Sequence, residues 1–220
     1  MDRTELCRRY RAVPVPVVCD ALYALGMKEQ VLPSRLRPLL PDTRIVGEAY
    51  TVLGRAIAPV TWDEGIPLIE PYLRVFEELT PDCIIVSVNP NSTVGHFGEL
   101  TANAAQAQGC QGVILEGNLR DTEGLRNIGF QVFYSELSPT NAIGRWEMEA
   151  SQVAVSIGGV TVSPGDIVVA DFDGIVIVPR ADSKRVLLEA ESIDAAEAAV
   201  RSEAAEGIPP MTSFEKHGHI

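Results

Sequence analysis

The sequence predicts a layered α/β fold that ends in a helical arm. Apolar strand patterns at 44–53, 83–88 and 112–115 alternate with helical patterns, which is typical of α/β proteins. Between 153 and 179 the pattern changes to short β segments joined by Gly-Gly, Pro-Gly and Asp-Gly turns, and this close spacing favours antiparallel hairpins. The charged stretch 181–206 then predicts a long helix.

The remaining elements follow from local signals. Val13-Pro-Val-Pro is expected to be extended, because each proline disfavours the helical region for the residue before it. Segments 31–43, 54–65 and 135–150 are expected to be irregular. The other predicted elements are helices at 2–12, 17–25, 66–79, 99–108 and 121–127, and a strand at 130–134. We predict a single domain over 1–220, with a core at 13–180 and the helical arm at 181–220.

The composition argues against several classes of function and location. The formal net charge of −12 disfavours binding to nucleic acid or to an anionic membrane surface. No apolar run approaches the ~20 residues of a membrane helix, and the N-terminal stretch lacks the apolar core of a secretory signal. The four cysteines show no CxxC spacing, so buried reduced thiols in a cytoplasmic protein are expected.

The stretch from Gly98 to Asp121 carries the most chemical information. A glycine-flanked helix start at Gly98 leaves backbone N–H groups free, and such an end binds carboxylates or phosphates. Twenty residues lie between Glu99 and Arg120, and a helix followed by a strand of that length returns to the same edge of the sheet. We therefore predict that amides, a guanidinium and two carboxylates surround one small volume, which suits an anionic substrate and a divalent cation.

Each residue of this set also has a purely structural interpretation. Arginine forms a planar fork that matches a carboxylate, and aspartate is a hard ligand for Mg²⁺ or Mn²⁺. Alternatively, Asp121 caps the next helix, Arg120 makes a surface ion pair, and Glu99 is an ordinary first-turn acid. His96 could be an acid, a base or a ligand, but no metal-ligand spacing surrounds it. Arg145 and Trp146 fit either a pocket or an interface.

Several segments together resemble a known family. They are CDALYALG at 19–26, VGEAYTV at 46–52, GEL at 98–100 followed by the spacing to Arg120-Asp121, GGVTVSPGDIVVADFDGIVIVP at 158–179, and EKHG at 215–218. In this combination the chain resembles the RraA-like proteins, which include the 4-hydroxy-4-methyl-2-oxoglutarate aldolases, also called 4-carboxy-4-hydroxy-2-oxoadipate aldolases.

The resemblance implies a β/β/α swivelling-type fold that assembles as trimers, or as hexamers of two trimers, with sites between subunits. It implies a class II aldolase, dependent on Mg²⁺ or Mn²⁺, that cleaves a 4-hydroxy-2-oxo dicarboxylic or tricarboxylic acid into pyruvate and a second oxo acid. The same enolate chemistry would permit oxaloacetate decarboxylation. We expect 54–66 and 135–150 to line the pocket.

The resemblance also assigns roles by position. The pyruvyl group would be held by Arg120 and by the backbone of Gly98, Glu99, Leu100 and Thr101. Asp121 would bind the metal directly, while Glu99 and Glu197 of a neighbouring subunit would bind it through water. Thr101 departs from the leucine expected of the family, and we expect this change to alter the shape of the pocket.

Two other functions are compatible with the family. Its regulators bind and inhibit ribonuclease E, and the net charge of −12 would suit docking on an arginine-rich segment. Another small-acid lyase on the same scaffold is the third possibility. The Glu99, Arg120 and Asp121 set and the acidic helical arm favour the aldolase.

Overall fold

The computed structural model describes residues 1–90 and 92–218. Among these residues, nine strands form one mixed sheet of order β1-β6-β5-β3-β2-β10-β11, with β4 beside β5 and β7 beside β2. The strands β2, β3, β5 and β6 are mutually parallel, whereas β10 joins β2 in the antiparallel sense. The small hairpin of β8 and β9 lies outside this sheet.

The strands have the following bounds: β1 Arg37–Pro38, β2 Ile45–Ala56, β3 Cys83–Val88, β4 Gly95–Phe97, β5 Gly112–Leu119, β6 Val132–Leu137, β7 Trp146–Ser151, β8 Val155–Ile157, β9 Val160–Val162, β10 Ile167–Asp171 and β11 Gly174–Val178. The helices are α1 Arg3–Ala12, α2 Val15–Ala24, α3 Trp62–Glu78, α4 Glu99–Ala107, α5 Thr122–Asn127, α6 Ser183–Ala205 and α7 Pro210–His217, with a 3₁₀ turn at Arg180–Asp182.

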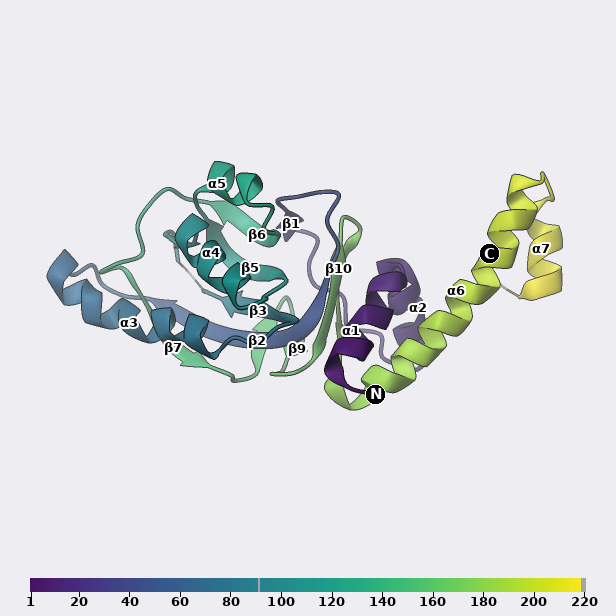
Figure 1. Ribbon diagram of the computed structural model, residues 1–220, viewed down its shortest axis with the longest axis horizontal. Coiled ribbons are helices and arrows are strands. Elements are labelled where there is room, and N and C mark those ends of the chain that lie inside the picture. The colour runs from purple at the N-terminus through teal and green to yellow at the C-terminus, as the bar shows by residue number, and fades with distance from the viewer. Residues whose placement is uncertain (91, 219–220) are drawn as a thin grey trace.

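Three apolar clusters hold the layers together. Helices α3, α4 and α5 pack on one face of β3, β5 and β6, and the β8–β9 hairpin packs on the opposite face of the sheet. Helices α1, α2 and α6 pack against β10 and β11 at the far end of the molecule (Figure 1). The outer half of α6 extends away from this body, and α7 folds back on it.

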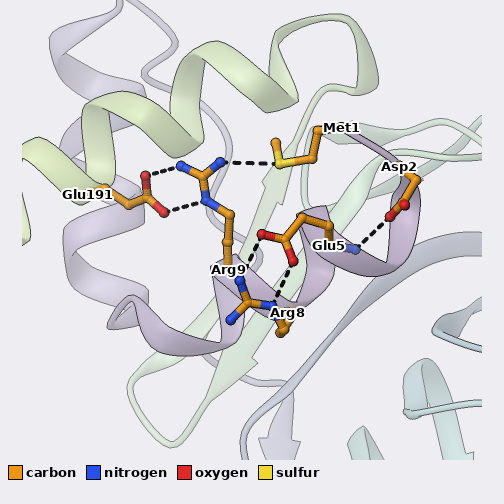
Figure 2. Close-up of polar contacts among 6 residues, drawn as sticks. All are labelled: Met1, Asp2, Glu5, Arg8, Arg9 and Glu191. Atoms are coloured by element: carbon orange, nitrogen blue, oxygen red, sulfur yellow. Dashed lines mark hydrogen bonds and ion pairs between the residues drawn. The ribbon is translucent and has the colours of Figure 1, made fainter.

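The root of the arm is fixed to α1 by a bidentate ion pair. Arg9 Nε donates to Glu191 Oε1 at 2.7 Å, and a second guanidinium nitrogen contacts Glu191 Oε2 (Figure 2). On α1 itself, Asp2 caps the helix and Arg8 pairs with Glu5. Because both α1 and α2 contact α6, the arm leaves the body in a defined direction.

Most predicted elements are confirmed, and the corrections have identifiable causes. Helix α2 begins at Val15, so the segment Val13–Pro16 is not wholly extended: Pro16 lies in the first turn, where its missing N–H is not needed. The prediction of a loop at 54–65 was wrong at both ends. Strand β2 continues to Ala56, and α3 begins at Trp62 behind a capping box of Thr61 and Glu64.

Further segments were also assigned wrongly. Residues 135–137, expected to be irregular, continue strand β6, and Arg37–Pro38 of the expected loop at 31–43 form strand β1. Residues 146–150 belong to strand β7, whose Trp146 fills space that only a glycine leaves: a Cβ at Gly54 would lie 2.3 Å from the indole ring. The polar tail contains helix α7, which Pro210 initiates at a position that suits proline. No helix of the described residues is long and apolar enough to cross a membrane.

Candidate functional site

The two ends of the segment from Gly98 to Asp121 meet in the structure. Strand β4 runs beside the end of β5, and the backbone N–H of Arg120 donates to the carbonyl of Phe97 at 3.0 Å. The N–H of Glu99 approaches Asp121 Oδ2 at 3.4 Å. The start of α4 and the end of β5 therefore face each other at one edge of the sheet.

The first turn of α4 divides its backbone donors into two groups. The N–H of Gly98 is engaged by the Thr101 hydroxyl at 3.1 Å, and the same hydroxyl donates to the Gly98 carbonyl at 2.9 Å. The amides of Leu100 and Thr101 have no acceptor among the described residues. Thr101 thus closes the turn with its own side chain, and two amides stay available to an anion.

Asp121 has an unusual backbone conformation. Its φ of 56° and ψ of 38° lie in the left-handed region, which few residues other than glycine adopt. Although it occupies the N-cap of α5, its side chain makes no capping hydrogen bond. Its carboxylate instead lies between Glu99 N and Arg120 Nε, which is 3.2 Å from Oδ1. Asp121 therefore occupies the predicted N-cap position of α5, but its carboxylate does not cap the helix.

Two glycines make room for Arg120 and Asp121. A Cβ at Gly98 would lie 2.4 Å from Asp121 Oδ2 and 2.9 Å from Arg120 Cγ, and a Cβ at Gly95 would lie 3.0 Å from Arg120 Cβ. The stem of Arg120 therefore crosses both glycines. Its terminal guanidinium nitrogens have no protein acceptor among the described residues, so they are free to take a ligand carboxylate.

The side chain of Glu99 lies against α5. A Cβ at Gly124 of α5 would lie 2.3 Å from Glu99 Oε2, so the Glu99 carboxylate occupies space that a glycine leaves. Glu99 and Asp121 are hard oxygen donors at one edge, which suits Mg²⁺ held by one or two carboxylates and several waters. Within the described residues, no group of three or more acidic, histidine or cysteine side chains could hold a metal.

A pocket of about 340 Å³ opens beside these residues. Its polar lining includes Arg120, Asp121, Thr101, His96 and Asn141. Most of its apolar lining comes from α3 and from the loop before β7, and the start of α4 adds to it. These apolar residues are Trp62, Ile69, Tyr72, Leu73, Phe97, Leu100, Ala142 and Ile143. Of the two segments expected to line the pocket, 54–66 contributes Trp62 and 135–150 contributes 141–143.

His96 is buried at the back of this pocket and is held on both nitrogens. Nδ1 accepts from the N–H of Asn118 at 3.4 Å, which leaves Nε2 to donate to the Ser92 hydroxyl at 2.6 Å. Burial lowers the pKa of His96 to about 4, so the ring is neutral near pH 7. With both nitrogens engaged, His96 is a structural link between β4 and β5 rather than a free base.

Glu197, the acid expected from a neighbouring arm, lies on the outer half of α6. Its Oε2 accepts from Arg201 Nη1 at 2.9 Å, one turn further along the same helix. Within one chain it belongs to the arm, and its predicted role in another subunit stays a prediction.

Comparison with known proteins identifies the family of this chain. The profile of the RraA-like family, described as Aldolase/RraA, matches residues 15–177, which include the whole segment from Gly98 to Asp121. The chain belongs to the RraA-like family.

Several relatives of this RraA-like protein illustrate the range of the family. A protein of Halalkalibacterium halodurans named "Putative 4-hydroxy-4-methyl-2-oxoglutarate aldolase" is 24% identical over 85% of this chain and 82% of its own length. The crystal structure of Streptomyces coelicolor RraAS2, "an unusual member of the RNase ES inhibitor RraA protein family", gives a TM-score of 0.79 at 26% identity and covers 90% of this chain and 98% of its own.

A third relative matches nearly the whole chain. The crystal structure of an uncharacterized protein from Pseudomonas syringae pv. tomato gives a TM-score of 0.82 at 25% identity, with 96% of each chain covered. These likenesses confirm the predicted fold class, an RraA-like α/β architecture. The family contains proteins named as aldolases and proteins named as ribonuclease inhibitors, so membership alone leaves both activities open.

Sequence reasoning placed 54–66 and 135–150 at the pocket but missed the part of its apolar lining that α3 supplies through Ile69, Tyr72 and Leu73. Trp62 was placed in a loop, and Tyr72 and Leu73 were interpreted only as parts of an amphipathic helix. The capping pattern at Thr61 and Glu64 was the signal that could have placed Trp62 at the start of α3. Nothing in the sequence shows that the loop at 141–143 turns toward Arg120.

Proposed function

We propose that this RraA-like protein is a divalent-metal-dependent aldolase that cleaves a 4-hydroxy-2-oxo acid and releases pyruvate. The observation that supports the proposal most strongly is the convergence of Glu99, Arg120 and Asp121 beside a pocket, with free amides at Leu100 and Thr101. Retro-aldol cleavage has to stabilise the negative charge of an enolate, and this arrangement gathers the groups that can do so.

The residues present fit a divalent cation. Asp121 would hold the ion directly, and Glu99 would hold it through water, within a coordination shell of hard oxygens. When bound, such an ion polarises the 2-oxo group as a Lewis acid. A carboxylate from a neighbouring subunit, with Glu197 as our choice, would add to this set only if its pair with Arg201 opens or is shared.

The chain's own residues would then perform the remaining tasks. The Arg120 guanidinium would bind the carboxylate of the pyruvyl part in its planar fork. The amides of Leu100 and Thr101 would orient the same group at the positive end of α4. Glu99 is the base that we assign to the proton of the 4-hydroxyl, directly or through one water.

Pyruvate release from 4-hydroxy-4-methyl-2-oxoglutarate and from oxaloacetate, measured with Mg²⁺ and again with a chelator, tests the proposal. We expect activity with Mg²⁺ and its loss with the chelator. Arg120→Ala should lower kcat/KM by about 30- to 900-fold, which corresponds to roughly 2–4 kcal/mol. Arg185→Ala is the matched control, because Arg185 is an exposed arginine on α6.

An Arg120→Ala variant as active as the parent would contradict this assignment. The alternative function in the same family is binding and inhibition of a ribonuclease. Absence of pyruvate release with Mg²⁺, together with inhibition of ribonuclease E by the purified chain, would favour that alternative.

A further inference from the structure

The hydroxyl of Thr101 bonds both peptide groups that flank Gly98. Its Oγ1 accepts from the N–H of Gly98 at 3.1 Å and donates to the carbonyl of Gly98 at 2.9 Å. A hydroxyl has a single proton, so the bond to the carbonyl uses it. Thr101 stands at the third position of α4, from which a side chain can reach back to the N–H of the N-cap residue. Its polar atom is therefore committed to the backbone of the turn.

The first of the two peptide groups carries the backbone of Arg120. This group consists of the Phe97 carbonyl and the Gly98 N–H, and its carbonyl accepts from the N–H of Arg120 at 3.0 Å. Because a peptide group is planar, its carbonyl and its N–H move together. The bond from Gly98 to Thr101 thus helps to fix the carbonyl on which Arg120 is held.

The second peptide group faces the carboxylate of Asp121. It consists of the Gly98 carbonyl and the Glu99 N–H. The carbonyl accepts from the Thr101 hydroxyl and from the N–H of Ala102, the latter at 3.0 Å. On the opposite side of the same plane, the Glu99 N–H approaches Asp121 Oδ2 at 3.4 Å. Thr101 thus helps to set the direction of the N–H group that faces this carboxylate.

The joint between the two peptide groups is a glycine. A Cβ at Gly98 would lie 2.4 Å from Asp121 Oδ2, so the close approach of the carboxylate requires a residue without a side chain. Glycine also has more conformational freedom than any other residue. The Thr101 hydroxyl restrains that freedom, because it bonds the peptide group on each side of the joint.

Leucine, which the family resemblance leads us to expect at position 101, has no polar side-chain atom and could bond neither peptide group. The threonine of this chain therefore does more than change the shape of the pocket, because it ties the N-cap of α4 on both sides. Thr101, Gly98, Arg120 and Asp121 all belong to one chain. Their arrangement is thus present in each subunit, whatever a neighbouring subunit adds to the site.

We propose that Thr101 is a positioning residue: through the two peptide groups of Gly98, its hydroxyl holds the backbone of Arg120 and the carboxylate of Asp121 in a fixed relation. The inference rests on the proposed function, in which Asp121 holds the divalent cation and Arg120 the substrate carboxylate. Loss of the hydroxyl should therefore weaken binding of the cation as well as catalysis, since outer partners of a metal ligand fix its orientation.

Thr101→Val tests the proposal, because valine keeps the shape of threonine and lacks the hydroxyl. Binding of Mn²⁺ to the full chain, first freed of metal with a chelator, is followed without substrate by electron paramagnetic resonance of the free ion. We expect the affinity to fall on the order of 10-fold. We expect kcat/KM for pyruvate release from 4-hydroxy-4-methyl-2-oxoglutarate or from oxaloacetate, at saturating Mn²⁺, to fall by about 10- to 100-fold.

A conservative variant and a matched control accompany this change. Thr101→Ser keeps the hydroxyl and should retain both quantities within about 3-fold of the parent. Thr161→Val removes the hydroxyl of an exposed threonine in the β8–β9 hairpin, on the opposite face of the sheet, and should change neither. Thr101→Ala serves as the second variant without a hydroxyl if Thr101→Val fails to fold, as judged by its thermal unfolding.

The outcomes separate this inference from the function beneath it. Parental Mn²⁺ affinity and kcat/KM in Thr101→Val overturn the inference, even if its thermal stability falls, because Thr101 is then only a helix cap. Parental Mn²⁺ affinity with a lowered kcat/KM also overturns it, because the hydroxyl then acts on the substrate and not through Asp121. If the parent binds Mn²⁺ but releases no pyruvate, the proposed aldolase fails, whereas the Mn²⁺ affinities still decide on Thr101. A parent that binds no Mn²⁺ overturns both proposals.

Discussion

Replacing Gly98 by alanine tests the site with the smallest possible change. The new methyl carbon would lie 2.4 Å from Asp121 Oδ2, whereas ordinary contacts of this kind begin near 3.4 Å. The Asp121 carboxylate must therefore move by about 1 Å. Because Gly98 has an extended φ of −157°, alanine fits the backbone without strain, and the perturbation stays at the side chain.

A displacement of about 1 Å in a catalytic geometry costs on the order of 100-fold in rate, or about 2.7 kcal/mol. We expect Gly98→Ala to lower kcat/KM for pyruvate release by about that factor. Unfolding stability should fall by no more than the roughly 1–3 kcal/mol typical of overpacking. The assays are steady-state pyruvate release with Mg²⁺ and thermal unfolding followed by circular dichroism.

Gly26→Ala is the contrasting control. Gly26 has a φ of 86°, and no atom would lie within 4 Å of a methyl carbon added there, so alanine strains the backbone by about 1–2 kcal/mol and touches nothing. It should lower stability and leave kcat/KM unchanged. Parental kcat/KM in Gly98→Ala would show that the Asp121 carboxylate is not at the reacting centre, and the reasoning about the site would fail.

Two further predictions concern the arm and the thiols. Glu203 accepts hydrogen bonds from His217 and Ser213 and pairs with Lys216, contacts that lower its pKa from 4.5 to about 2. The contacts that hold α7 on α6 are thus fully present above pH 4.5 and lost as the pH falls toward about 2. The protection of the α7 amides, measured relative to their intrinsic exchange rate at each pH, should therefore fall over that window in the parent and not in Glu203→Gln; unchanged protection in the parent would refute this. Among the four free cysteines, Cys19 is partly exposed and the others are buried, and burial raises the pKa of Cys7 to about 11. Iodoacetamide should therefore label Cys19 first in the folded protein, as peptide mass spectrometry would show, and labelling of Cys83 or Cys110 at the same rate would contradict the packing.

The sequence specifies the central β-α-β framework well because its signals are local. The apolar run at 83–88 and the hairpin turns of 153–179 were sufficient to place β3 and β8 to β11. By contrast, β7 depends on a distant match: Trp146 packs over Gly54, a pairing that a single sequence does not reveal. Strand 146–151 is thus set by tertiary packing rather than by its own pattern.

The candidate site likewise has one part that the sequence predicts and another part that it does not. Chain length and direction were enough to predict that Glu99 and Arg120 would come together, since a helix and a strand of fixed rise must return to one edge. The engagement of Gly98 N–H by Thr101, and the apolar lining at Trp62 and Leu73, depend on side-chain directions and on a loop path. Neither leaves a periodic trace in the sequence.

The left-handed backbone at position 121 restricts which acid can serve there. Aspartate and asparagine tolerate this conformation, whereas the longer glutamate side chain has no such tendency. The position of the carboxylate and the left-handed backbone therefore both depend on aspartate. Lengthening the side chain by one methylene, to glutamate, would disturb both. A variant that changes the properties of this site is therefore expected to carry its substitutions at the surrounding residues, because the backbone conformation at position 121 restricts the acid itself to aspartate.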